Sequence, residues 1–136
     1  MKQLTILILS VMMLISCNTS KDSAEKGSIF NTEFDTPYGM PPFEKITNAD
    51  FKPAFEKGIK QQSDEIESIV NNTDVPTFEN TIVALDNSGE ILTRVSSVFY
   101  GLKGAENNDT LQAIAEEMSP ILSEHSDNIY LNNELF

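Results

Sequence analysis

The sequence predicts an all-α fold, on three observations. Apolar residues recur every three or four positions in three long stretches, each bounded by polar or turn-forming residues. No stretch shows the apolar–polar alternation that is typical of a half-buried strand. With 136 residues and 40% apolar content, the chain has the composition of a globular protein, and its length suits one domain or a piece of a larger one.

Residues 1–16 are typical of a secretory signal peptide. Met1 and Lys2 give a positive start, and an almost unbroken apolar run from 4 to 15 follows. This run is too short to span a bilayer as a settled helix. It leads into LISC, which resembles the lipobox of bacterial lipoproteins, so Cys17 is predicted to be lipidated and to become the first mature residue. A plain signal peptide followed by a chance cysteine is the alternative.

Lipidation at Cys17 would anchor the protein in the bacterial cell envelope. The next residue, Asn18, is not the aspartate associated with inner-membrane retention, which favours the outer membrane. Residues 17–29 are predicted to form a flexible tether, because NTSKDSAEKGS contains no large apolar side chain to bury.

Residues 30–46 are predicted to form an extended strap that lies over the helical body. Three prolines within six positions remove amide donors and forbid a regular helix there. The aromatic side chains are expected to dock in grooves between the helices, and a disordered leader is the alternative. These aromatic residues are Phe30, Phe34, Tyr38 and Phe43.

Residues 47–136 are predicted to contain three amphipathic helices, the first of which should end at 71–74, before Pro76. Its start has two signals: Thr47 and Asp50 have the spacing of a capping box, whereas Pro53 favours a regular helix that begins near residue 53. The apolar stripe of this helix consists of Phe51, Phe55, Ile59, Ile66, Ile69 and Val70.

The second helix is predicted to start after the N-cap Thr77, with Glu79 in its first turn, and to end at Gly101 and Gly104. Gly89 interrupts its stripe and predicts a close neighbour or a slight bend, because glycine costs about 1 kcal/mol of helix propensity. The stripe consists of Ile82, Leu85, Leu92, Val95, Phe99 and Leu102.

The third helix should follow 107–109, kink at Pro120 without splitting, and end at 130–133. Residues 134–136 resemble the opening of a further element. The stripe of this helix consists of Leu111, Ile114, Ala115, Met118, Ile121, Leu122, His125 and Ile129.

Charge and residue counts exclude several kinds of function. With 21 acidic and 9 basic side chains, the formal net charge is −12, which argues against binding nucleic acid because phosphates would be repelled. One cysteine cannot form an internal disulfide. One histidine cannot supply the paired histidines of a zinc H-E-x-x-H motif, and no Gly-rich phosphate loop or G-x-S-x-G elbow is present. The sequence therefore predicts no catalytic, cofactor-binding or metal-ligating residue among these 136.

Two polar features still need an interpretation. Glu116 and Glu117 are interpreted as a solvated helix surface rather than as a general acid and base. His125 continues an apolar stripe, and either a metal-ligand or substrate-contact role or a structural role is open to it. The structural interpretation is favoured: a partly buried histidine that hydrogen-bonds to a neighbouring helix or to the strap.

Several segments resemble the amino-terminal region of the thimet oligopeptidase family of zinc metallopeptidases, in its bacterial peptidyl-dipeptidase (dipeptidyl carboxypeptidase) branch. The resemblance runs from Phe34 to Phe136 and includes TPYGMPPFEKI and LQAIAEEMSPILSEHSDNIYLNNELF. Its most specific stretch is PTFENTIVALDNSGEIL, with residues 76–81 and Gly89 in family positions. The resemblance implies a nearly all-helical protein several times longer than this chain, with its zinc ligands far toward the carboxyl end.

By this resemblance the chain is the leading fragment of an enzyme that releases dipeptides from the carboxyl ends of short peptide substrates. The fragment would build part of the helical wall beside the substrate channel, would pack against the rest of the same polypeptide, and would be inactive alone. Zinc would belong to the full-length parent. The alternative is a non-enzymatic envelope lipoprotein whose small helical bundle binds a peptide or a partner protein.

Overall fold

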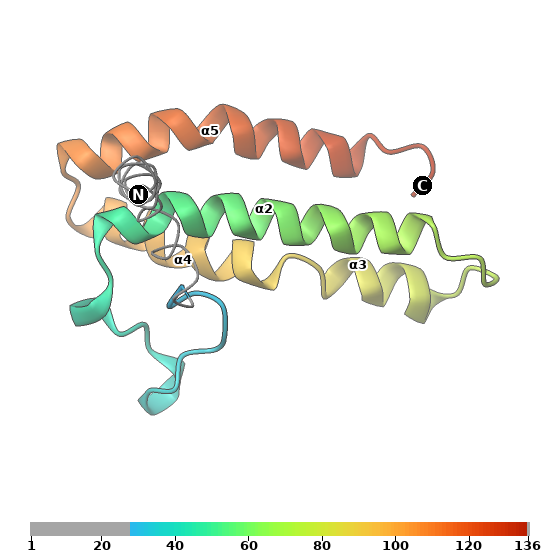
Figure 1. Ribbon diagram of the computed structural model, residues 1–136, viewed down its shortest axis with the longest axis horizontal. Coiled ribbons are helices and arrows are strands. Elements are labelled where there is room, and N and C mark those ends of the chain that lie inside the picture. The colour runs from blue at the N-terminus through green and yellow to red at the C-terminus, as the bar shows by residue number, and fades with distance from the viewer. Residues whose placement is uncertain (1–27, 136) are drawn as a thin grey trace, which may run out of the picture.

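The structure is a computed structural model that describes residues 28–135, and over this range it confirms the all-α fold. Helix α2 (Asn48–Val70) lies between α5 (Asp109–Tyr130) and the line formed by α3 (Ala84–Asp86) and α4 (Glu90–Ala105) (Figure 1). No strand occurs from residue 28 to residue 135. The predicted signal peptide, the lipidation of Cys17 and most of the predicted tether lie outside the described residues.

None of the helices in the described part of the chain combines the length and the apolar character needed to cross a membrane.

The start of α2 is set by its capping residues and not by its proline. The backbone N–H of Thr47 donates to Asp50 Oδ2 at 2.8 Å, and the Thr47 hydroxyl donates to the same oxygen at 2.7 Å. These two bonds form the cap of the helix, and the first of them satisfies the backbone N–H of Thr47. The helix therefore begins at Asn48 and includes Pro53, so the expectation of a start near residue 53 was wrong. Its end at Val70 agrees with the prediction.

The second predicted helix is divided. Its first part is a π-helix, η3 (Phe78–Val83), which runs directly into α3, and α4 then begins after a turn. Thr77 caps η3 as expected, since its hydroxyl accepts from the Asn80 N–H at 3.1 Å. At Gly89 the backbone is left-handed (φ 74°), so this residue breaks the helix instead of bending it slightly.

Helix α5 has the predicted bounds and is not split. Asn108 caps it by accepting from the Leu111 N–H at 3.0 Å, and the helix continues through Pro120 to Tyr130. One stripe residue differs, because Ile121 is 41% exposed. The chain then turns, and Leu135 is buried against the bundle.

Two apolar clusters hold the bundle together. The larger cluster joins α2, α4 and α5 around Phe51, Phe55 and Phe99, which are fully buried. The smaller cluster lies toward the other end of α2, where Ile66 packs with Ile129 and Leu135 and the partly buried Leu85 of α3 covers them.

The strap is only partly as predicted, because it contains two single 3-10 turns, η1 (Pro37–Gly39) and η2 (Phe43–Lys45). Phe30 is fully buried beside Phe51, and its carbonyl accepts a hydrogen bond from Arg94 Nη1 at 2.8 Å. Phe34 packs against the larger cluster. Tyr38, however, is fully exposed and Phe43 is about half exposed, so the expectation that all four rings dock was wrong.

Candidate functional site

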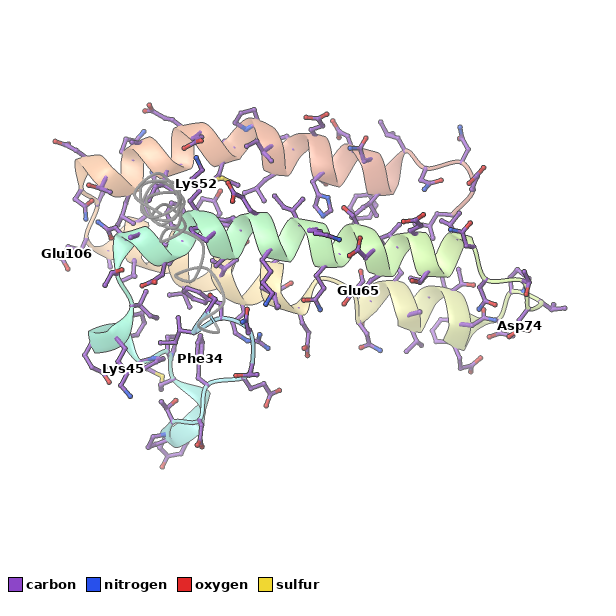
Figure 2. The ribbon with its side chains drawn as sticks, in the orientation of Figure 1. Phe34, Lys45, Lys52, Glu65, Asp74 and Glu106 are labelled. Carbon is purple, nitrogen blue, oxygen red and sulfur yellow. The ribbon has the colours of Figure 1, made fainter. Side chains whose placement is uncertain are left out.

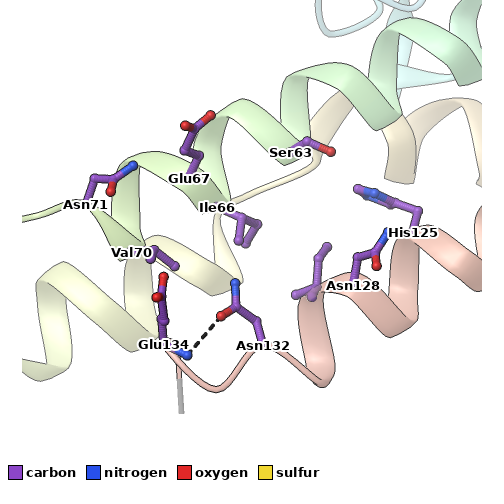
Figure 3. A pocket seen from close by; sticks show the side chains of 10 residues that line it. Ser63, Ile66, Glu67, Val70, Asn71, His125, Asn128, Asn132 and Glu134 are labelled. Carbon is purple, nitrogen blue, oxygen red and sulfur yellow. Dashed lines mark hydrogen bonds between the residues drawn. The ribbon is translucent and has the colours of Figure 1, made fainter.

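The candidate site is a cleft of about 360 Å³ between the second halves of α2 and α5 (Figure 3). Most of its lining is polar, and the turn after α5 closes one side through a hydrogen bond from the Glu134 N–H to Asn132 Oδ1 at 2.9 Å. The volume lies within the range of small-ligand pockets. The lining residues are Ser63, Ile66, Glu67, Val70, Asn71, His125, Asn128, Ile129, Asn132 and Glu134.

His125 lies on the α5 side of the cleft and is 7% exposed. Its Nε2 is 2.8 Å from Gln62 Oε1 on α2, so the predicted hydrogen bond to a neighbouring helix is confirmed. The amide nitrogen of Gln62 donates to Ser88 Oγ at 3.2 Å, which leaves the amide oxygen as the acceptor. His125 Nε2 therefore carries the proton, and this ring nitrogen is already occupied.

The same polar contacts continue to the break before α4. The Gly89 N–H donates to Glu65 Oε2 at 2.8 Å, and the Ser88 hydroxyl donates to the Leu85 carbonyl at 2.8 Å. A Cβ atom at Gly89 would lie within about 2.5 Å of the Gln62 amide, which confirms the close neighbour expected at this glycine. Gln62 and Glu65 thus attach α2 to the α3–α4 turn, and Gln62 also attaches it to α5.

Sequence reasoning did not identify Gln62, Glu65 or Ser88 as members of this network. Glu65 lies in the last third of α2 (Figure 2) and follows another acidic residue, Asp64. Nothing in its neighbours along the chain marks it as a partner of a backbone N–H 24 residues away. The only local signal was Gly89, which indicated that something would approach closely there without indicating what.

The acidic pair on α5 lies at the surface, as predicted. Glu117 forms a half-exposed ion pair with Lys52 of α2, and this hydrogen bond raises the pKa of the lysine. Glu116 accepts a hydrogen bond from Gln112 Nε2 at 2.7 Å, one helical turn away. Such exposed pairs contribute little to stability, and their geometry is that of a helix surface.

The cleft offers hydrogen-bonding groups and two carboxylates rather than a reactive assembly. Across residues 28–135, no three histidine, cysteine, aspartate or glutamate side chains come together in a way that could hold a metal ion. His125 is joined to an amide and not to a carboxylate or a hydroxyl nucleophile. The observed hydrogen bonds instead connect α2 to α5 and to the turn between α3 and α4.

Burial of His125 gives the chain an expected pH dependence. Desolvation lowers the pKa of His125 from its usual 6.5, so the native state binds the proton less readily than the unfolded chain does. Stability from this residue is complete above 6.5 and is lost as the pH falls below that value. Unfolding in urea should be measured at about pH 7.5 and at about pH 5. Between these two pH values the unsubstituted chain should lose more stability than His125→Gln, a variant that keeps an N–H donor but does not titrate. A constant difference between the two proteins would contradict this expectation.

Comparison with known proteins gives a family relationship. The chain is 46% identical over 107 residues to a dipeptidyl carboxypeptidase of Escherichia coli, a match that covers 79% of this chain and 16% of that protein. It is 45% identical over 100 residues to the dipeptidyl carboxypeptidase of Salmonella typhimurium, covering 74% of this chain and 15% of the relative. Oligopeptidase A of Escherichia coli is 31% identical over 91 residues, covering 67% of this chain and 13% of the relative.

These similarities confirm the resemblance to the thimet oligopeptidase family and its dipeptidyl carboxypeptidase branch. The chain spans about one sixth of the length of these two dipeptidyl carboxypeptidases. No protein-family model matches the chain.

Proposed function

Since this chain is a homologue of the dipeptidyl carboxypeptidases, we propose that it is the amino-terminal helical wall of a longer peptidase that releases dipeptides from the carboxyl ends of oligopeptides. The observation that carries the proposal is the 46% identity over 107 residues, in which 79% of this chain corresponds to only 16% of its relative. Identity at this level over so much of the chain supports a shared fold and a shared place in the longer protein.

The architecture suits a wall rather than a reactive centre. Helix α2 has 23 residues and is therefore about 34 Å long, with α4 and α5 packed along it. Buried aromatic rings and the Gln62 hydrogen bonds hold these helices together as one slab. We propose that in the longer protein this slab forms one side of the substrate channel. It would limit which substrates can enter the channel and so favour short peptides.

Zinc is assigned to the parent and not to these residues. A catalytic zinc site needs about three protein ligands, mostly histidine together with a carboxylate. The chain has one histidine, and its Nε2 is joined to Gln62. The residues present therefore do not fit a zinc site, and we derive no step of hydrolysis from them.

Expression to the natural end of the reading frame tests the proposal. The longer protein should release dipeptides from the carboxyl end of an amino-blocked oligopeptide, detected by mass spectrometry, and a zinc chelator should abolish this release. The 136-residue chain should show no release under the same conditions. A stop codon directly after Phe136, or a longer protein with no peptidase activity, would instead favour a small envelope lipoprotein that binds a peptide or a partner.

We also propose that the parent is lipid-anchored through Cys17 in the bacterial envelope, with the outer membrane as its site. The support is the sequence LISC after an apolar run, followed by Asn18. Protein extracted from membranes for the activity assay should have a mass that corresponds to a start at Cys17 plus acyl chains. Replacement by Cys17→Ser should remove that added mass, and an unmodified Cys17 in membrane extracts would contradict the anchor.

A further inference from the structure

The segment η3–α3 is apolar on two opposite faces. Leu85 on its inner face packs into the smaller apolar cluster with Ile66 of α2. On the other side Phe78 is 66%, Ile82 46% and Val83 38% exposed. No charged residue occurs from residue 80 to residue 85. Exposed apolar side chains that gather on one face of a segment, whose other face is already buried, indicate a contact surface.

Hydrogen bonds define both ends of the segment that carries this uncovered face. The Thr77 N–H donates to Asn80 Oδ1 at 2.7 Å and so closes the start of η3. After α3, Glu65 holds the Gly89 N–H and Gln62 holds the Ser88 hydroxyl. The amino end of the segment is therefore closed by a local cap, and its carboxyl end is attached to α2. The π-helical form of η3 is itself uncommon and is frequent at functional positions.

We infer that the outward face of η3–α3, formed by Phe78, Ile82 and Val83, is a docking surface for an apolar part of the same polypeptide beyond residue 136. This inference rests on the proposed function. The relatives provide the occupant: the matched region is 16% of the length of the Escherichia coli protein, so most of such a polypeptide is available to cover the face.

A second copy of this chain fits the same face poorly. Each copy carries a formal charge of −12, and the charge-free run is short, so two copies would bring strongly acidic surfaces together around a small apolar contact. A covalently continuous segment avoids the entropic cost of association. The face also lies within PTFENTIVALDNSGEIL, the stretch that carries the most specific family resemblance.

Thiol labelling tests this inference. In a Cys17→Ser background, Ile82→Cys places a single thiol on the face, and Glu106→Cys places one in the turn between α4 and α5, at the opposite end of the bundle from Asp74 (Figure 2). The thiol at position 82 should react with a maleimide about tenfold or more slowly in the longer protein than in the 136-residue chain. The rate at position 106 should be the same in both. Phe78→Cys serves as a second probe of the face.

The outcomes separate the inference from the proposed function. If the longer protein releases dipeptides and the thiols at 78 and 82 still react as fast as in the short chain, the docking surface is wrong and the peptidase assignment stands. If both test positions and position 106 are protected equally, the face is not specific and the inference fails. Concentration-dependent protection in the 136-residue chain together with a dimeric mass would assign the face to a second copy. A reading frame that closes after Phe136 would overturn both.

Discussion

Phe99→Ala should lower the free energy of unfolding of the 136-residue chain by about 3–5 kcal/mol. Phe99 is fully buried where α2, α4 and α5 meet. Its ring makes edge-to-face contacts with Phe51 and Phe55, with centroids 5.1 Å and 5.2 Å away. The substitution removes this apolar area from the core and leaves a cavity that two helices would have to collapse to fill. Because small domains are stable by about 5–15 kcal/mol, much of the total would be lost.

Urea unfolding followed by circular dichroism measures this effect, and the adjacent residue provides a control. Tyr100 also contacts the Phe99 ring, with centroids 5.1 Å apart, but it is 46% exposed. Tyr100→Ala should therefore cost clearly less, about 1 kcal/mol. Equal shifts of the urea midpoint for the two variants would show that the aromatic cluster does not carry the stability assigned to it.

The apolar periodicity of the sequence was enough to predict the three long helices, because each stripe reports a face buried against a neighbour. The ends were predictable where a local side chain makes them: Asn108 accepts from the Leu111 N–H, and Thr77 accepts from the Asn80 N–H. These contacts span three residues, so they can be read from sequence. The start of α2 shows the limit, since the sequence carried two local signals and only the structure shows that the Thr47 cap prevails over Pro53.

The sequence could not show that the helix breaks completely at Gly89, because the apolar residues on either side keep a helical spacing. Leu85 and Leu92 are seven residues apart, which is two helical turns, so the stripe looks continuous across the break. The stabilising contacts come from Gln62 and Glu65, on another helix. The π-helical turn also alters the phase, and this explains why Ile82, expected on the buried stripe, points outward.

The candidate site was predictable only in part. The position of His125 in an apolar stripe correctly predicted its burial and its hydrogen bond to a neighbouring helix. The partner, Gln62, is 63 residues away along the chain and could not be named without the fold. In the strap, the aromatic residues alone could not show that Phe30 is buried beside Arg94 and Phe51 while Tyr38 is left in solvent.

Gly58→Ala should destabilise the chain although it replaces glycine by the best helix former in the middle of a helix. Gly58 is buried in α2, where the backbone of α4 comes unusually close. A Cβ atom there would lie 2.8 Å from the Leu92 nitrogen and 2.9 Å from its Cα. These are backbone atoms, so no change of rotamer can relieve the overlap and the two helices must move apart. The movement would loosen the packing of the buried Val95 and Phe99, one and two turns further along α4.

The expected result is a net loss of about 1–3 kcal/mol, because the cost of overpacking exceeds the gain of about 1 kcal/mol in helix propensity. Gly101→Ala is the matched control, since Gly101 lies within α4 and its added Cβ would meet nothing within 4 Å. That control should stabilise the chain by up to about 1 kcal/mol. Opposite signs for the two variants in urea unfolding would establish that α2 and α4 touch through their backbones at Gly58. If both variants raise the stability equally, α2 and α4 are further apart at Gly58 than the structure places them, and the close backbone contact between the two helices would be contradicted.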